Sequence, residues 1–104
     1  MKLVIGGAYQ GKTEYARKHY AGMEIATNFH LTILEMVKNG IDTTLNLSEY
    51  ANKVIICDDI SCGVVPIDPI MRRWREELGR VLAILARESD EVVRLFCGIP
   101  TKLK

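Results

Sequence analysis

The stretch "GGAYQGKT", residues 6–13, narrows the possible folds of this 104-residue chain more than any other feature of the sequence. It follows the apolar run 3–5 and precedes the helix-like residues "EYARK". Its spacing fits G-x-x-x-x-G-K-[ST], a loop whose backbone N–H groups face phosphates where a strand leads into a helix. The context predicts a phosphate-binding loop between a strand and a helix.

Each residue type of this loop has a physical task. Glycine lets the backbone wrap closely around phosphate oxygens, Lys12 brings a positive charge to the β- and γ-phosphates, and the Thr13 hydroxyl is placed to bind Mg²⁺. An ordinary glycine-rich turn is the alternative interpretation. We expect ATP or GTP as co-substrate, Mg²⁺ as cofactor, and the nucleotide-binding residues Gly6, Gly7, Ala8, Gln10, Gly11, Lys12 and Thr13.

Short β-rich runs alternate with helical stretches along the rest of the chain. Such alternation, with nearly continuous apolar strands, favours a parallel sheet covered by helices on both faces. We predict one P-loop NTPase-like domain over residues 1–104, a three-layer α/β/α fold with a small parallel sheet. The expected strands are 3–5, 23–26, 54–57 and 91–97, and the expected helices are 13–20, 29–38 and 69–88, with a further turn opening at Ser48.

Two of these helices have recognisable starts. Asn28 is a candidate N-cap for the second helix, and Asp68 caps the long one, with Pro69 at its first position. The second helix carries Phe29, Ile33, Met36 and Val37 on one face. The long helix carries an apolar arc of Ile70, Trp74, Leu78, Val81, Leu82 and Leu85.

Composition excludes several classes of partner. A formal net charge of +1 gives no electrostatic case for nucleic acid or an anionic membrane. No apolar run reaches the ~20 residues of a membrane span, and no secretory signal opens the chain, so we expect a cytoplasmic protein. Cys57, Cys62 and Cys97 lie in or beside apolar runs without C-x-x-C spacing, which predicts buried reduced thiols.

Acidic residues follow one of the apolar runs, in "VIICDDIS". A carboxylate at the end of a strand beside a phosphate loop is suited to orient Mg²⁺, so Asp58 and Asp59 join Lys12 as candidate catalytic residues. Strand alternation points their side chains to opposite faces, so we expect one of them to face the loop. The alternative is that they merely end the strand.

Two parts of the sequence resemble a known family. "GGAYQGKTEYA" is similar to the G-G-A-x-x-G-K-S-x-x-A opening of the bifunctional adenosylcobinamide kinase and adenosylcobinamide-phosphate guanylyltransferases. Residues 59–104 are similar to the family's N-E-V-G-x-G-I-V-P segment, its R-x-F-R-D-x-x-G-R helix and its G-I-P-x-x-L-K ending. "MEIAT", residues 23–27, resembles its second strand.

The resemblance implies phosphorylation of the adenosylcobinamide hydroxyl by a nucleoside triphosphate, in late cobalamin assembly, by a homo-oligomer. It gives the phosphate role to Gly7, Lys12 and Thr13, and places Asp59 at the acidic position that serves Mg²⁺. Family members are longer, and their H-H-x-x-R-P segment, whose histidine takes GMP, is missing between residues 27 and 54. We therefore expect phosphoryl transfer without guanylyl transfer, with His19 and His30 as ordinary surface or partly buried histidines.

The long helix carries five arginines interleaved with glutamates. They are either a solvated face or, for Arg75 and Arg80 at the family's R-D-x-x-G-R positions, a phosphate or subunit contact. Gly79, Ala83 and Ala86 form a stripe of small residues where a neighbouring subunit could approach.

Three functions remain open from sequence. The first is a compact kinase acting on adenosylcobinamide or a related hydroxyl acceptor. The second is a nucleotide-binding accessory or regulatory protein that has lost its substrate-handling segment. The third is a relative without a ligand.

Overall fold

The computed structural model describes residues 1–44, 47–60 and 67–104. Its five-stranded sheet has the order β2-β3-β1-β4-β5. The first four strands run parallel, and β5 is antiparallel to β4. The strands are β1 (Lys2–Gly6), β2 (Glu24–Ala26), β3 (Lys53–Asp58), β4 (Glu91–Phe96) and β5 (Ile99–Lys102).

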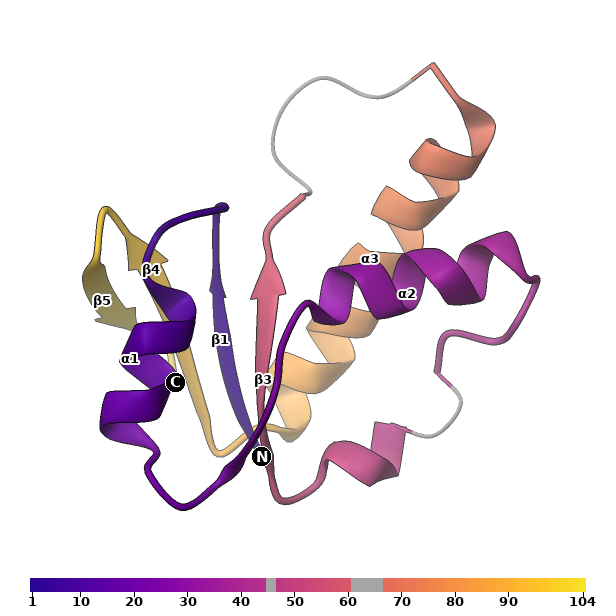
Figure 1. Cartoon of the computed structure of the whole chain (residues 1–104). Coiled ribbons are helices and arrows are strands. Elements are labelled where there is room, and N and C mark those ends of the chain that lie inside the picture. Colours follow the sequence, from indigo (N-terminus) through magenta and orange to yellow (C-terminus); the bar gives the residue numbers. More distant parts are fainter. Residues whose placement is uncertain (45–46, 61–66) are drawn as a thin grey trace.

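Helices cover both faces of the sheet, as predicted (Figure 1). α1 packs on one face, against a core of Val4, Val54, Ile56, Val93 and Leu95. α2 and α3 pack together on the other face, where they bury Leu3 and Ile55. The helices are α1 (Lys12–His19), α2 (Phe29–Lys38), α3 (Pro69–Glu88) and the 3-10 turn η1 (Leu47–Tyr50).

The three central strands β3, β1 and β4 carry the buried residues of the sheet, because helices cover both of its faces. β3 has four consecutive buried residues, 54–57, and therefore reads as a continuous apolar run. Its register pairs Gly6 of β1 with Asp58, so the carboxyl ends of these two strands lie next to each other. This pairing brings the end of "VIICDD" beside the phosphate loop.

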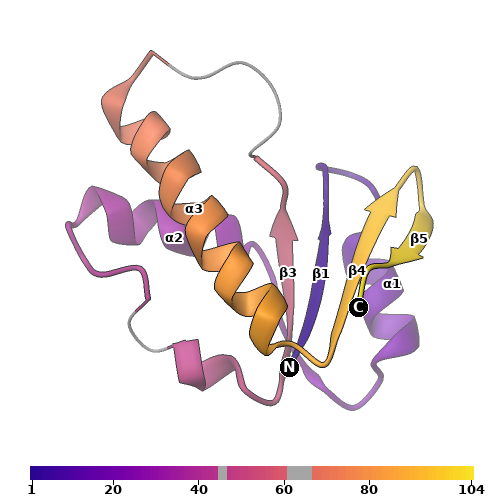
Figure 2. The same ribbon diagram turned by 180° about the vertical axis from the view of Figure 1, so that it is seen from behind.

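The long helix α3 begins and ends as the sequence predicts. The Asp68 carboxylate accepts a hydrogen bond from the Ile70 backbone N–H at 2.8 Å. Of the predicted apolar arc, Leu78, Val81 and Leu85 are buried, whereas Ile70 is 47% exposed. Ile70 was expected in the core and is not, because the first turn of α3 extends past the sheet, as Figure 2 shows.

The start of α2 differs from the prediction in its chemistry. Asn28 stands at the N-cap, but its side chain makes no capping hydrogen bond. Its backbone is left-handed, with φ of 54°. Asparagine tolerates that conformation better than most residues, and this tolerance suits it to the sharp entry into α2.

β5 was not predicted. Cys97 and Gly98, with φ of 51° and 74°, form the turn that returns the chain alongside β4. All four residues of β5 are exposed, and Pro100 cannot donate a ladder hydrogen bond, so the segment lacks the usual sequence marks of a strand.

In the part of the chain that the structure describes, every helix is too short or too polar to pass through a bilayer.

Candidate phosphate-binding site

The predicted phosphate loop, residues 6–13, leads from the carboxyl end of β1 into the amino end of α1, in the strand-to-helix context that the sequence predicts. At Gly6 a Cβ atom would lie 2.5 Å from the Leu95 carbonyl oxygen, so a side chain is excluded by the neighbouring strand. Gly11 has φ of 86°, a conformation that favours glycine. These two glycines are therefore required by the path of the loop itself.

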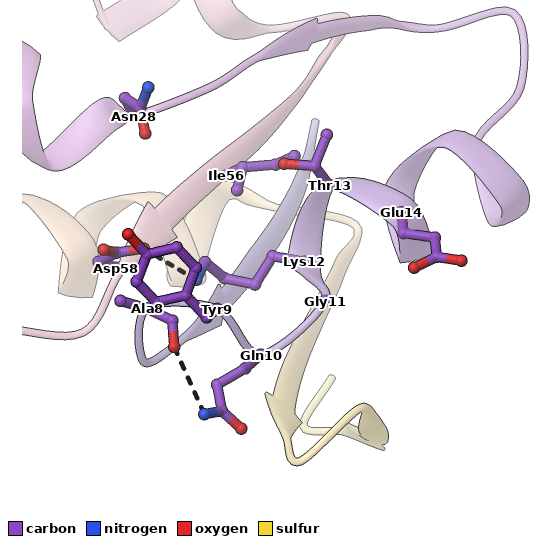
Figure 3. A pocket seen from close by; sticks show the side chains of 10 residues that line it. All are labelled: Ala8, Tyr9, Gln10, Gly11, Lys12, Thr13, Glu14, Asn28, Ile56 and Asp58. Carbon is purple, nitrogen blue, oxygen red and sulfur yellow. Dashed lines mark hydrogen bonds and ion pairs between the residues drawn. The ribbon is translucent and has the colours of Figure 1, made fainter.

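Lys12 and Asp58 meet at the centre of the site. The Lys12 side chain is buried, and its Nζ lies 2.8 Å from Asp58 Oδ1 and donates a hydrogen bond to the Gly7 carbonyl oxygen. Figure 3 shows the two side chains pointing toward each other across the loop. The buried ammonium is stable there because a carboxylate compensates its charge.

A pocket of about 390 Å³ opens over this ion pair. Five of the seven predicted loop residues line it: Ala8, Gln10, Gly11, Lys12 and Thr13. Gly6 is buried below them, and Gly7 is exposed at the start of the loop. Tyr9, Glu14, Asn28, Ile56 and Asp58 complete the lining (Figure 3).

Of the two candidate acids, Asp58 lines the pocket and pairs with Lys12. The backbone N–H of Asp59 donates to the Gly6 carbonyl oxygen at 2.8 Å, which ties the end of β3 to the start of the loop. Asp59, which the resemblance assigns to Mg²⁺, does not line the pocket.

The oxygen atoms in this pocket fit Mg²⁺. The Thr13 hydroxyl and the Asp58 carboxylate line the same cavity. Mg²⁺ prefers hard oxygen ligands, and it is commonly held by one or two protein groups together with phosphate oxygens and water. These two residues would hold the ion if the loop carried phosphates.

His30 belongs to this site, which the sequence did not reveal. Its Nδ1 accepts a hydrogen bond from the Asp58 backbone N–H at 3.1 Å, and its Nε2 lies 3.5 Å from Asp58 Oδ2. The Trp74 indole N–H donates to the His30 carbonyl oxygen at 2.7 Å. The one available signal was its position just after β2, because carboxyl ends of parallel strands share one edge of the sheet.

The surroundings of His30 favour its neutral form. Burial lowers its pKa below the ordinary value of 6.5, the Asp58 carboxylate opposes that shift, and the Lys12 ammonium adds to it. A neutral ring that accepts at Nδ1 carries its proton on Nε2, toward the carboxylate. His30 therefore holds the end of β3 through the hydrogen bond at Nδ1, while its Nε2 faces the Asp58 carboxylate. His19 is exposed, as expected.

The arginines of α3 lie elsewhere. Arg80 pairs with Glu77 at 2.7 Å and donates to the Thr43 hydroxyl, in a separate pocket. Neither Arg80 nor Arg75 lines the pocket over Lys12 and Asp58. The structure thus brings the loop and Asp58 together but leaves these arginines outside that cavity.

The cysteines divide into two environments. Cys57 is buried as predicted, and burial, helped by the charges of Asp58 and Asp59, raises its pKa to about 12, so it stays a thiol. The prediction was wrong for Cys97, which is exposed because it forms the β4–β5 turn. Cys62 and the "GVVP" stretch of the sequence lie outside the described residues.

Comparison with known proteins adds two findings to this geometry. The chain is 29% identical over 97 residues to the bifunctional adenosylcobalamin biosynthesis protein CobU of Salmonella typhimurium, an alignment that covers 93% of this chain and 49% of that protein. The chain thus spans about half the length of this relative. Residues 28–103 match the profile of a family described as cobinamide kinase / cobinamide phosphate guanyltransferase. With a matching profile over most of its length, the chain belongs to the cobinamide kinase / cobinamide phosphate guanyltransferase family.

Proposed function

We propose that this chain transfers the γ-phosphoryl group of ATP or GTP to the hydroxyl of adenosylcobinamide or a related corrinoid, in cobalamin biosynthesis. The observation that carries the proposal is the meeting of Lys12 and Asp58 under a glycine-rich loop at the amino end of α1. Family membership supports the choice of acceptor.

The residues of the pocket suggest how the reaction is assisted. The backbone N–H groups at the start of α1 and the Lys12 ammonium balance the negative charge of the phosphates. Lys12 exchanges the Gly7 carbonyl oxygen for a phosphate oxygen when the nucleotide enters. Thr13 and Asp58 would hold Mg²⁺, which would supply positive charge against the phosphates.

In this scheme the acceptor oxygen forms a bond to the γ-phosphorus as the bond from that phosphorus to the β-phosphate oxygen breaks. The nucleoside diphosphate leaves with the bonding electrons, and the hydroxyl proton passes to solvent. His30 positions Asp58 through the backbone N–H and touches no reacting atom.

The test is a transfer assay with γ-labelled ATP or GTP, Mg²⁺ and adenosylcobinamide. Label should appear in adenosylcobinamide phosphate, and Lys12→Ala should lower the rate by about 100-fold or more. Lys38→Ala is the matched control, because Lys38 is an exposed lysine at the end of α2. Equal rates for Lys12→Ala and the wild-type chain would refute the proposal.

The same assay separates the accessory function from the kinase. The chain spans about half of its relative, which makes a nucleotide-binding protein without transfer activity the second candidate. Nucleotide binding that depends on Lys12, without any labelled product, would favour this second function.

A further inference from the structure

Tyr9, in the middle of the predicted phosphate loop, has a side chain that the fold does not use. The side chain is fully exposed, although it lines the pocket over Lys12 and Asp58. Its backbone is left-handed, with φ of 58°, a conformation that costs strain for a bulky residue. Within residues 1–44, 47–60 and 67–104 the ring has no hydrogen-bond partner and stacks on no other ring. Packing within the chain therefore gives no reason for an aromatic side chain here.

Asn28 is a second exposed residue with these properties. Among the described residues other than glycine, the left-handed backbones belong to Tyr9, Asn28 and Cys97. Tyr9 and Asn28 both line the same pocket. The Asn28 side chain makes no capping hydrogen bond with α2, so its amide is available to a ligand. Two polar or aromatic side chains without work inside the chain thus meet at one cavity.

The pocket has two sides with different chemistry. The start of α1 supplies one side, where backbone N–H groups and the Lys12 ammonium suit phosphates. Tyr9, Asn28 and Asp58 belong to the other side, and Figure 3 shows them across the pocket from Glu14 of α1. They come from the middle of the loop, the entry into α2 and the end of β3. This second side is the one left for a ligand other than the phosphates.

The geometry of phosphoryl transfer says which ligand belongs there. The attacking oxygen and the leaving oxygen lie roughly in line through the phosphorus. With the γ-phosphate beside Lys12 and the diphosphate extending along the start of α1, the acceptor hydroxyl approaches from the side of Asp58. Tyr9 and Asn28 flank that approach.

We propose that Tyr9 and Asn28 form the contact surface for the acceptor. The Tyr9 ring stacks on a flat apolar face of the acceptor, and the Asn28 amide hydrogen-bonds to polar groups at its edge. A fully exposed ring gains from such stacking because the contact removes apolar surface from water. The inference rests on the proposed function and deepens it, since it assigns the acceptor side of the same pocket.

The choice of acceptor would then depend on a residue that the family pattern leaves open. Position 9 is unspecified in the G-G-A-x-x-G-K-S opening, so Tyr9 is a feature of this chain. A large ring system that carries the hydroxyl fits an aromatic ring at this place better than a small alcohol does.

The experiment measures initial rates of transfer from γ-labelled ATP or GTP to adenosylcobinamide at varied acceptor concentration. Tyr9→Asn removes the ring and keeps a residue that tolerates a left-handed backbone. It should raise the KM for the acceptor by about tenfold and change kcat and the KM for the nucleotide by less than about twofold. Tyr9→Phe keeps the ring and should restore the wild-type KM. Asn28→Gly should raise the KM for the acceptor by about fivefold.

Phe96→Asn is the matched control, because Phe96 is an exposed aromatic residue of β4 that does not line the pocket. It should leave all three kinetic parameters unchanged, and circular dichroism confirms that each variant is folded. In the wild-type chain, adenosylcobinamide should shift the NMR signals of the Tyr9 ring and of the Asn28 side-chain amide, and leave the Phe96 ring signals in place.

The outcomes separate this inference from the proposed function. If the wild-type chain transfers label and Tyr9→Asn keeps the wild-type KM for the acceptor, the inference is overturned and the proposed function stands. A Tyr9→Phe protein as impaired as Tyr9→Asn, or a change confined to the KM for the nucleotide, also overturns it. If the wild-type chain transfers no label to adenosylcobinamide, the proposed function and this inference both fail.

Discussion

At the scale of single residues, the contacts among Lys12, Asp58 and His30 determine the arrangement of the candidate site. They come from α1, β3 and α2, and they meet because the amino ends of the helices lie at the carboxyl edge of the sheet. A buried lysine is costly unless its charge is compensated, and Asp58 compensates it. His30 in turn holds Asp58. Asp58 therefore places Lys12, and His30 places Asp58.

His30 should make stability depend on pH. Its pKa in the folded chain lies below 6.5, so as pH falls below 6.5 the unfolded chain takes up a proton that the folded chain resists. The contribution of His30 to the free energy of unfolding is complete above about pH 6.5 and is lost as the pH falls below that value. The wild-type chain should lose more thermal stability between about pH 7.5 and about pH 5.5 than His30→Asn. Equal losses in the two proteins would show that His30 does not titrate in this way.

Gln10 should hold the β4–β5 turn in place. Its side-chain oxygen accepts from the Cys97 N–H, and its amide nitrogen lies 3.4 Å from the Ala8 carbonyl oxygen. Gln10→Ala should lower the free energy of unfolding by about 1 kcal/mol. Hydrogen exchange at the Cys97 amide should become faster, while exchange in α3 changes little. Unchanged protection of that amide would contradict the assignment.

At the scale of elements, α3 shows how far an apolar arc predicts burial. Leu78 is 1% exposed and packs against the sheet, whereas Ile70 is 47% exposed. Leu78→Ala should lower the free energy of unfolding by about 2–5 kcal/mol, because it leaves a cavity. Ile70→Ala should cost less than ~1 kcal/mol. Urea denaturation of both variants distinguishes the two sites, and similar losses would place Ile70 in the core after all.

Much of this fold can be predicted from the sequence, and there are physical reasons why the remaining elements and contacts cannot. β1, β3 and β4 are predictable because their buried residues are consecutive or nearly so. β5 is not, because it is wholly exposed and contains a proline. The loop and Lys12 are readable from local spacing. The choice between Asp58 and Asp59, and the contact of His30, depend on strand order, which no local pattern encodes.

At the scale of the whole molecule, the stripe of Gly79, Ala83 and Ala86 on α3 remains a predicted subunit contact. A Cβ at Gly79 would meet no atom within 4 Å, so a larger side chain fits the single chain. Gly79→Leu should therefore preserve or raise the stability of the chain, since mid-helix glycine costs about 1 kcal/mol relative to alanine.

The same substitution should reduce the size of the assembly in solution, because leucine would obstruct a neighbouring helix. Sedimentation velocity measures this, and Lys38→Leu is the control for an added exposed leucine. An unchanged sedimentation coefficient for Gly79→Leu would exclude the stripe as the contact.

The position of β1 in the middle of the sheet has a consequence for synthesis. β1 pairs on one side with β3 and on the other with β4. In the pairing with β4, Lys2 lies opposite Glu91. The loop that follows β1 contacts β4 and its turn: Gly6 packs against the Leu95 carbonyl oxygen, and the Gln10 side chain accepts a hydrogen bond from the Cys97 N–H. A ribosome makes residues 1–13 before their neighbours in β4, which emerge about 90 residues later. The site therefore assembles only after residue 97 has left the exit tunnel. Until then the edge of β1 that pairs with β4 stays exposed.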